Sequence, residues 1–102
     1  MGWAAPYIAK LKAGETVTFR PRGNSMTGKV DSGQLVTVSP ADGQHVEKGD
    51  IVLCKVNGNE YLHLVSAVAS GGRQFQISNN RGYVNGWTSR DKIYGICTKV
   101  ED

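Results

Sequence analysis

Short runs in which apolar and polar residues alternate, separated by Gly, Pro, Asn or Asp, make up most of the chain. Alternation with a period of two is typical of β-strands, and these runs are also rich in β-branched residues. The pattern predicts strands over residues 16–20, 34–38, 51–56, 59–68, 73–77 and 92–100. The Gly/Asn-rich segment 79–86 does not follow the pattern and is predicted to be a loop.

The N-terminal region is predicted to be helical rather than extended. Residues 4–12 are predicted to form about two turns of helix, because Pro6 is tolerated in a first turn and Gly14 is a suitable stop. Farther along, Asn57-Gly58 is the clearest hairpin signal, since both residues tolerate the positive φ angles of a type I′ turn. This turn makes strands 51–56 and 59–68 antiparallel neighbours.

Many short strands joined by tight turns favour a mainly β fold, either a small barrel or a coiled sheet, with one short helix in front of it. The chain has 102 residues, which is enough for one small core and too few for two. We therefore expect an N-terminal arm over residues 1–14 and a single β domain over residues 15–102.

Composition narrows the choice of environment and chemistry. The content of 39% hydrophobic and 21% charged residues, with a net charge of +3, is ordinary for a soluble domain. No apolar run approaches the roughly 20 residues that span a bilayer, and the N-terminus has no secretory pattern, so we expect a cytoplasmic protein. Cys54 and Cys97 lie in apolar runs and are expected to be free thiols. No cluster has metal-ligand spacing, and no cofactor is expected.

The residues that can carry chemistry are Ser25, in the glycine-led turn 23–26, and His63. A serine in such a turn is a candidate nucleophile, and an imidazole can take its proton near neutral pH. Lys55 is a rival base, but Glu60 is its expected cross-strand partner and would favour its charged form. We therefore interpret Lys55 as a surface ion-pair residue.

Three motifs resemble those of the LexA/signal-peptidase superfamily of serine peptidases. Residues 23–38 resemble its nucleophile box, Gly-x-Ser-Met followed by an aliphatic strand, and residues 49–52 resemble its Gly-Asp-Ile/Val-Val motif. Residues 93–96 resemble its closing Ile-x-Gly-x strand. In that superfamily the base lies a little under 40 residues after the serine, and His63 lies 38 residues after Ser25.

The sequence departs from the superfamily pattern in two respects. Most members use lysine as base, so His63 resembles the branch of endoplasmic-reticulum and archaeal signal peptidases, in which a downstream aspartate orients the histidine. No acid follows here until Asp91, so Asn79 or Asn80 is predicted to hold the imidazole, with Asp91 as a weaker candidate. In addition, Gly28 stands where the superfamily has proline.

The resemblance implies a stand-alone serine peptidase-like domain, for which a phage or prophage protein is a natural source. Ser25 would attack a peptide carbonyl and His63 would relay the proton. The backbone N–H groups of Asn24 and Ser25 would hold the oxyanion, and Met26 would line the substrate groove.

Two alternatives remain open. One is a catalytically idle member of the same fold that binds a protein, such as a host factor, and that can pair as a homodimer through its last strand. The other is nucleic-acid binding through arginines, with Tyr83 or Trp87 stacking on bases. The arginines are dispersed along the sequence, which does not favour nucleic acid.

Overall fold

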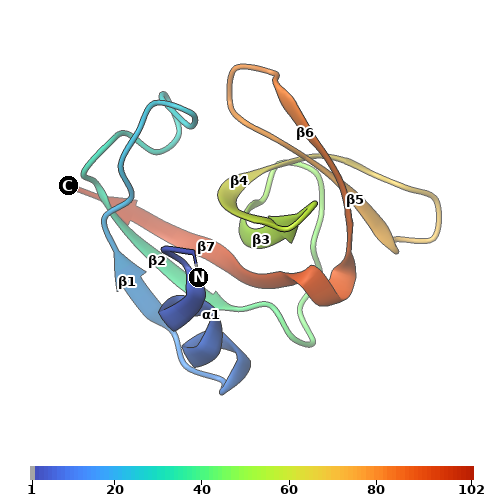
Figure 1. Ribbon diagram of the computed structural model, residues 1–102, viewed down its shortest axis with the longest axis horizontal. Helices are drawn as coiled ribbons and strands as arrows, with labels where there is room; N and C mark the ends of the chain where they lie inside the picture. The colour runs from blue at the N-terminus through green and yellow to red at the C-terminus, as the bar shows by residue number, and fades with distance from the viewer. Residues whose placement is uncertain (1) are drawn as a thin grey trace.

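Seven strands, one α-helix and one turn of 3₁₀ helix form the part of the chain that the computed structural model describes, residues 2–102 (Figure 1). In chain order the elements are α1 (Ala5–Lys12), β1 (Val17–Phe19), β2 (Leu35–Pro40), β3 (Ile51–Val56), β4 (Asn59–Val68), β5 (Gln74–Ser78), β6 (Val84–Ser89), η1 (Arg90–Lys92) and β7 (Ile93–Glu101). The expected mainly β fold with a short N-terminal helix is confirmed.

All seven strands belong to one antiparallel sheet in the order β1-β2-β7-β3-β4-β5-β6. The last strand, β7, lies inside the sheet and pairs with both β2 and β3. It therefore joins a half made of β1 and β2 to a half made of β3–β6 (Figure 1).

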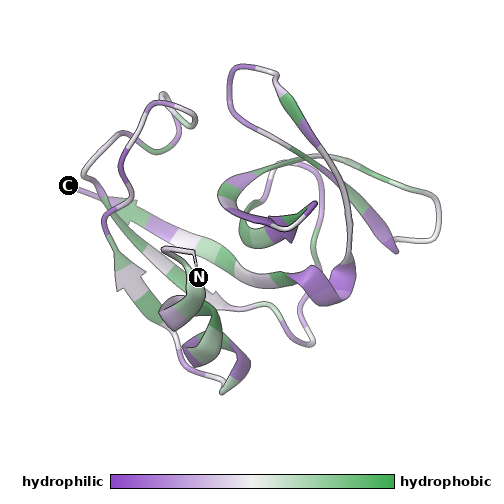
Figure 2. Cartoon of the chain, viewed as in Figure 1, coloured by the Kyte–Doolittle hydropathy of each residue, from purple (hydrophilic) through white to green (hydrophobic). Residues whose placement is uncertain are grey.

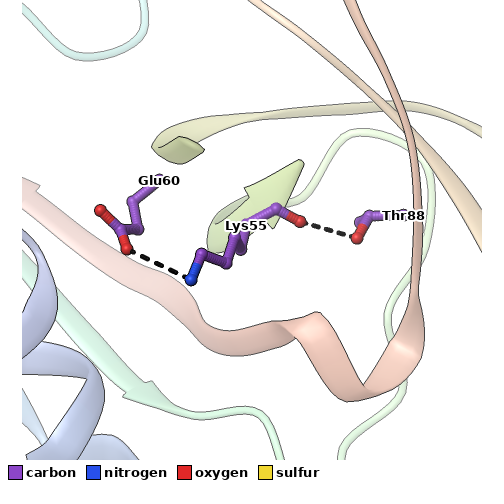
Figure 3. Close-up of polar contacts among 3 residues, drawn as sticks. All are labelled: Lys55, Glu60 and Thr88. Carbon is purple, nitrogen blue, oxygen red and sulfur yellow. Dashed lines mark hydrogen bonds and ion pairs between the residues drawn. The ribbon is translucent and has the colours of Figure 1, made fainter. Parts of the chain in front are cut away.

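The sheet is coiled rather than closed, because within residues 2–102 the edge strands β1 and β6 each pair on one side only. The second half curls so far that the Thr88 hydroxyl on β6 donates a hydrogen bond of 2.7 Å to the Lys55 carbonyl on β3 (Figure 3). Of the two predicted forms, the coiled sheet is the one observed.

Helix α1 covers one face of the first half and buries Leu11 against β7 (Figures 1 and 2). It ends as predicted, because Gly14 takes a φ of +88°. Beneath the helix, Gly95 leaves room for this packing. A Cβ there would lie 2.9 Å from Leu11 Cδ1 and 2.5 Å from Val38 Cγ1. The glycine of the closing motif is therefore required because a larger side chain would clash with these two residues.

Two apolar clusters fill the molecule. One lies between α1 and the first half of the sheet and includes Phe19, Met26 and Leu62. The other lies inside the curl of the second half and is built around Phe75 and Ile77. The first cluster supports the segments that carry Ser25 and His63. Met26 directly follows Ser25 in the sequence, and Leu62 directly precedes His63.

The β3–β4 hairpin forms as predicted. Asn57 and Gly58 take φ angles of +49° and +84°, and Val56 pairs with Asn59 across the turn. The resulting register sets Val52 opposite His63.

The main difference from the predicted elements is β6. Residues 79–86 were expected to be a loop throughout, but the loop ends at Tyr83 and Val84 begins a strand that pairs with β5. Asn85 and Gly86 are poor strand formers, so at these two positions the pairing of β6 with β5, rather than local propensity, keeps the chain extended.

Candidate active site

Ser25 lies in the long connection between β1 and β2, in a turn that its own side chains stabilise. Asp31 Oδ1 accepts the Gly28 N–H at 3.1 Å, and Ser32 Oγ accepts the Gly23 N–H at 3.2 Å. Met26 is buried in the core with 4% exposure, whereas Ser25 itself is exposed. The turn is therefore anchored from below while its serine hydroxyl stays open to solvent.

Asn80 clamps this turn from the loop between β5 and β6. Its backbone N–H donates to the Ser25 carbonyl at 2.8 Å, and its side-chain amide donates to the Thr27 carbonyl at 2.9 Å. Asn80 therefore belongs to the site, where it holds the turn that carries Ser25.

His63 comes from β4 and meets the serine side chain. Its Nε2 lies 3.1 Å from Ser25 Oγ, across 38 positions of sequence. The imidazole is 7% exposed and stacks on Tyr61, with ring centroids 4.7 Å apart and planes at 28°. The structure thus brings together the two residues that the sequence singled out.

Asn85, on β6, holds the other ring nitrogen. Its Oδ1 lies 2.7 Å from His63 Nδ1. An amide oxygen can only accept, so Nδ1 carries the proton and Nε2 is free to accept from the serine hydroxyl. This tautomer is the one that a general base needs.

The prediction that Asn79 or Asn80 orients the imidazole is therefore wrong. Asn79 Oδ1 accepts the N–H groups of Arg81 and Tyr83, both at 2.9 Å, and so closes its own loop. Asn80 is engaged with the serine turn, as described above. The missed residue, Asn85, follows Tyr-Val and precedes Gly-Trp-Thr; these β-favouring neighbours were the available signal for a strand.

The two other candidates, Asp91 and Lys55, have partners elsewhere. Asp91 lies in η1 and its carboxylate accepts the Ser89 hydroxyl. Lys55 Nζ lies 3.9 Å from Glu60 Oε2, the cross-strand partner expected from the sequence (Figure 3). The ion pair leaves His63 as the basic side chain in contact with Ser25.

Burial lowers the pKa of His63 below its ordinary value, an effect that the hydrogen bond to Asn85 partly opposes. A neutral imidazole is therefore the predominant form at neutral pH, without the large desolvation that a lysine base requires. In this neutral form, His63 Nε2 can accept a proton from the Ser25 hydroxyl.

The backbone of the turn offers donors for a developing negative charge. The N–H groups of Asn24 and Ser25 make no hydrogen bond within residues 2–102, while the Asn24 carbonyl is occupied by Thr27. Two free N–H groups beside a candidate nucleophile are the composition that an oxyanion hole requires.

A groove of about 640 Å³ opens over Ser25 and His63, and Met26 is among the residues that line it. One wall of the groove is β4, which pairs with β5 only from Leu64 onward. Residues 59–63 of β4 therefore pair with β3 along one edge, and their other edge has no strand partner within residues 2–102. Pockets that bury a ligand have volumes of about 300–1,000 Å³, so this groove can hold a peptide segment.

Within residues 2–102, His, Cys, Asp and Glu side chains form no group of three or more that could hold a metal ion. None of the helices in that range combines the length and apolar character needed to cross a bilayer. Cys54 and Cys97 are both free, and burial raises the pKa of Cys54 to about 12.

The curled sheet and its serine turn define a peptidase-like fold. Compared with family models, residues 4–96 match the family described as Peptidase S24-like, within the LexA/signal peptidase superfamily. The chain belongs to this Peptidase S24-like family. A search of curated proteins finds no match.

Proposed function

We propose that this protein is a serine peptidase in which Ser25 is the nucleophile and His63 the general base. The observation that carries the proposal is the continuous chain from Ser25 Oγ to His63 Nε2 at 3.1 Å and from His63 Nδ1 to Asn85 Oδ1 at 2.7 Å. The open groove beside this chain further supports an enzyme, because a relic pair would not require access for a substrate.

The reaction proceeds in two halves. Ser25 Oγ attacks the peptide carbonyl carbon while its proton passes to His63 Nε2, and the oxyanion is held by the N–H groups of Asn24 and Ser25. The C–N bond then breaks, and His63 returns the proton to the departing amine. In the second half, water attacks the acyl-enzyme with His63 again as base, which releases the acid and restores Ser25.

Asn85 serves as a positioning residue. It keeps the Nδ1–H tautomer and holds the ring plane toward Ser25, without taking up the proton itself. Unlike an aspartate, a neutral amide does not stabilise the imidazolium strongly. The base therefore stays neutral to lower pH than it would beside a carboxylate.

The test is covalent labelling with an alkyl fluorophosphonate, followed by mass spectrometry of the intact protein and of its peptides. We expect one adduct, on Ser25, and none on Ser25→Ala. His63→Ala should slow labelling by about 10²–10⁴-fold. Lys55→Met is the matched control, because it removes a basic side chain of β3 that does not contact Ser25, and it should label at the wild-type rate.

Folded protein that remains unlabelled, while a control serine hydrolase is labelled in the same tube, would contradict the proposal. The alternative would then be a protein-binding module of the same fold in which the Ser25–His63 pair is idle.

A further inference from the structure

Three aromatic rings cluster at one end of the groove. Tyr7 and Phe19 stack with ring centroids 4.5 Å apart. Trp3 packs against both at tilted angles, 5.7 Å from Phe19 and 6.4 Å from Tyr7. Two of the rings come from the N-terminal segment and one from β1, so α1 has a role beyond covering the core.

The aromatic cluster and the Ser25–His63 pair face the same groove. Trp3, Tyr7 and Phe19 line its volume of about 640 Å³ together with Ser25 and His63. Met26 and Leu62 also line it and belong to the apolar core. The three rings therefore share one groove with Ser25 and His63, and part of its lining is apolar.

Trp3 is left half open in this position. Its side chain is 50% exposed, although Phe19 beside it is only 7% exposed. A large apolar ring in a concave site retains a favourable hydrophobic contribution for a ligand that covers it. Charges do not select a ligand here, because Arg22 and Glu60, of opposite sign, both line the groove.

We propose that Trp3, Tyr7 and Phe19 form a specificity subsite for a bulky apolar side chain, aromatic or branched aliphatic, of a peptide substrate. This inference rests on the proposed function, because it names the substrate class of the Ser25 site. The subsite and Ser25 line the same groove, so one bound peptide can contact both.

Binding and turnover can be measured separately. The chain has two tryptophans, so in the double variant Ser25→Ala/Trp87→Phe the fluorescence comes from Trp3 alone. This variant is titrated with acetylated, amidated pentapeptides that are alanine except for a central Phe, Leu, Ala or Asp. We expect the Phe and Leu peptides to bind at least about tenfold more tightly than the Ala and Asp peptides, with a change in Trp3 emission.

The matched pair for turnover is Trp3→Ala and Trp87→Ala. Both rings are about half exposed, at 50% and 46%, but only Trp3 lines the groove. In otherwise wild-type protein, Trp3→Ala should lower kcat/KM for the Phe peptide by about 10–100-fold and leave the Ala peptide unchanged. Trp87→Ala should change neither, and thermal unfolding verifies that both variants are folded.

The outcomes separate the two proposals. A small alkyl fluorophosphonate reaches Ser25 without filling the subsite, so its rate should be the same in Trp3→Ala and wild type. Labelling of Ser25 together with equal binding, or no binding, of all four peptides would overturn the subsite and leave the peptidase intact. Trp3-dependent binding of Phe and Leu peptides without labelling would support the subsite and overturn the peptidase.

Discussion

Asn85 Oδ1 lies 2.7 Å from His63 Nδ1 and so fixes which nitrogen of the imidazole faces Ser25. The two residues are 22 positions apart, on strands β6 and β4, which are separated in the sheet by β5. The contact is made possible by the curl of the sheet, because strands two places apart in a flat sheet would be too distant for it.

Asn85→Ala should slow fluorophosphonate labelling of Ser25 by about 10–100-fold, because the imidazole loses both its orientation and its tautomer. Asn85→Asp should retain labelling but shift its pH midpoint upward, since a carboxylate favours the imidazolium. The measurement is the second-order labelling constant as a function of pH. Asn59→Ala, an exposed asparagine of β4, is the control. Wild-type kinetics for Asn85→Ala would show that the ring is held by other contacts.

Labelling should rise with pH, with a midpoint below the ordinary pKa of a histidine. The lowered pKa of His63 means that the base becomes neutral at a pH below about 6.5, the ordinary value for histidine. The midpoint of the labelling profile measures this directly. A midpoint above about 6.5 would contradict the effect of burial.

The same group should make the free energy of unfolding depend on pH. Below about pH 6.5 the unfolded chain binds a proton at residue 63 that the folded chain does not, so stability falls as pH drops through this range. The decline levels off below the folded pKa. Urea unfolding at several pH values measures it. His63→Gln should reduce the slope.

Asn80→Ala should lower the labelling rate by about tenfold, because the amide that holds the Thr27 carbonyl is lost while the backbone bond to Ser25 remains. Asn80→Asp has the same shape without the donor and should be at least as slow. A labelling rate equal to wild type in both variants would mean that the serine turn needs no clamp.

Gly28→Pro should damage the site although proline is the residue of the superfamily pattern. Gly28 has a φ of +99°, which proline cannot adopt, and its N–H donates to Asp31 Oδ1. We expect loss of Ser25 labelling together with a lower Tm. Asp31→Ala, which removes the same hydrogen bond without a change of backbone angle, separates the two contributions.

Gly95→Ala should lower the free energy of unfolding by about 1–3 kcal/mol, because the new methyl group overpacks the contact with Val38 and Leu11. In a domain of this size, each kcal/mol lowers Tm by roughly 4–8 °C. The cost should shrink in a Val38→Ala background, and a double-mutant cycle measures that coupling. A cost that is the same in both backgrounds would exclude the clash with Val38.

The hairpin and the helix could be predicted because each has a local signal, such as the positive φ that Asn57-Gly58 tolerates. The Ser25–His63 pair has no local signal. It was expected from the resemblance to the superfamily, in which the base follows the serine by a little under 40 residues.

Asn85 could not be predicted in the same way, because its role depends on tertiary structure. Its neighbours in sequence indicate a strand but not what that strand faces, and Asn85 reaches His63 only because the sheet curls. The aromatic cluster was missed for a related reason. Trp3 and Tyr7 meet Phe19 through the packing of α1, which no local pattern reveals.

The position of β7 between the serine half and the histidine half of the sheet has a consequence for folding. Among the described strands β7 is the last in chain order, and it pairs with both β2 and β3. A chain in which β7 has not yet joined the sheet lacks the strand pairing that connects the two halves. We therefore expect the Ser25–His63 pair to assemble late in folding, after β7 has added to the sheet.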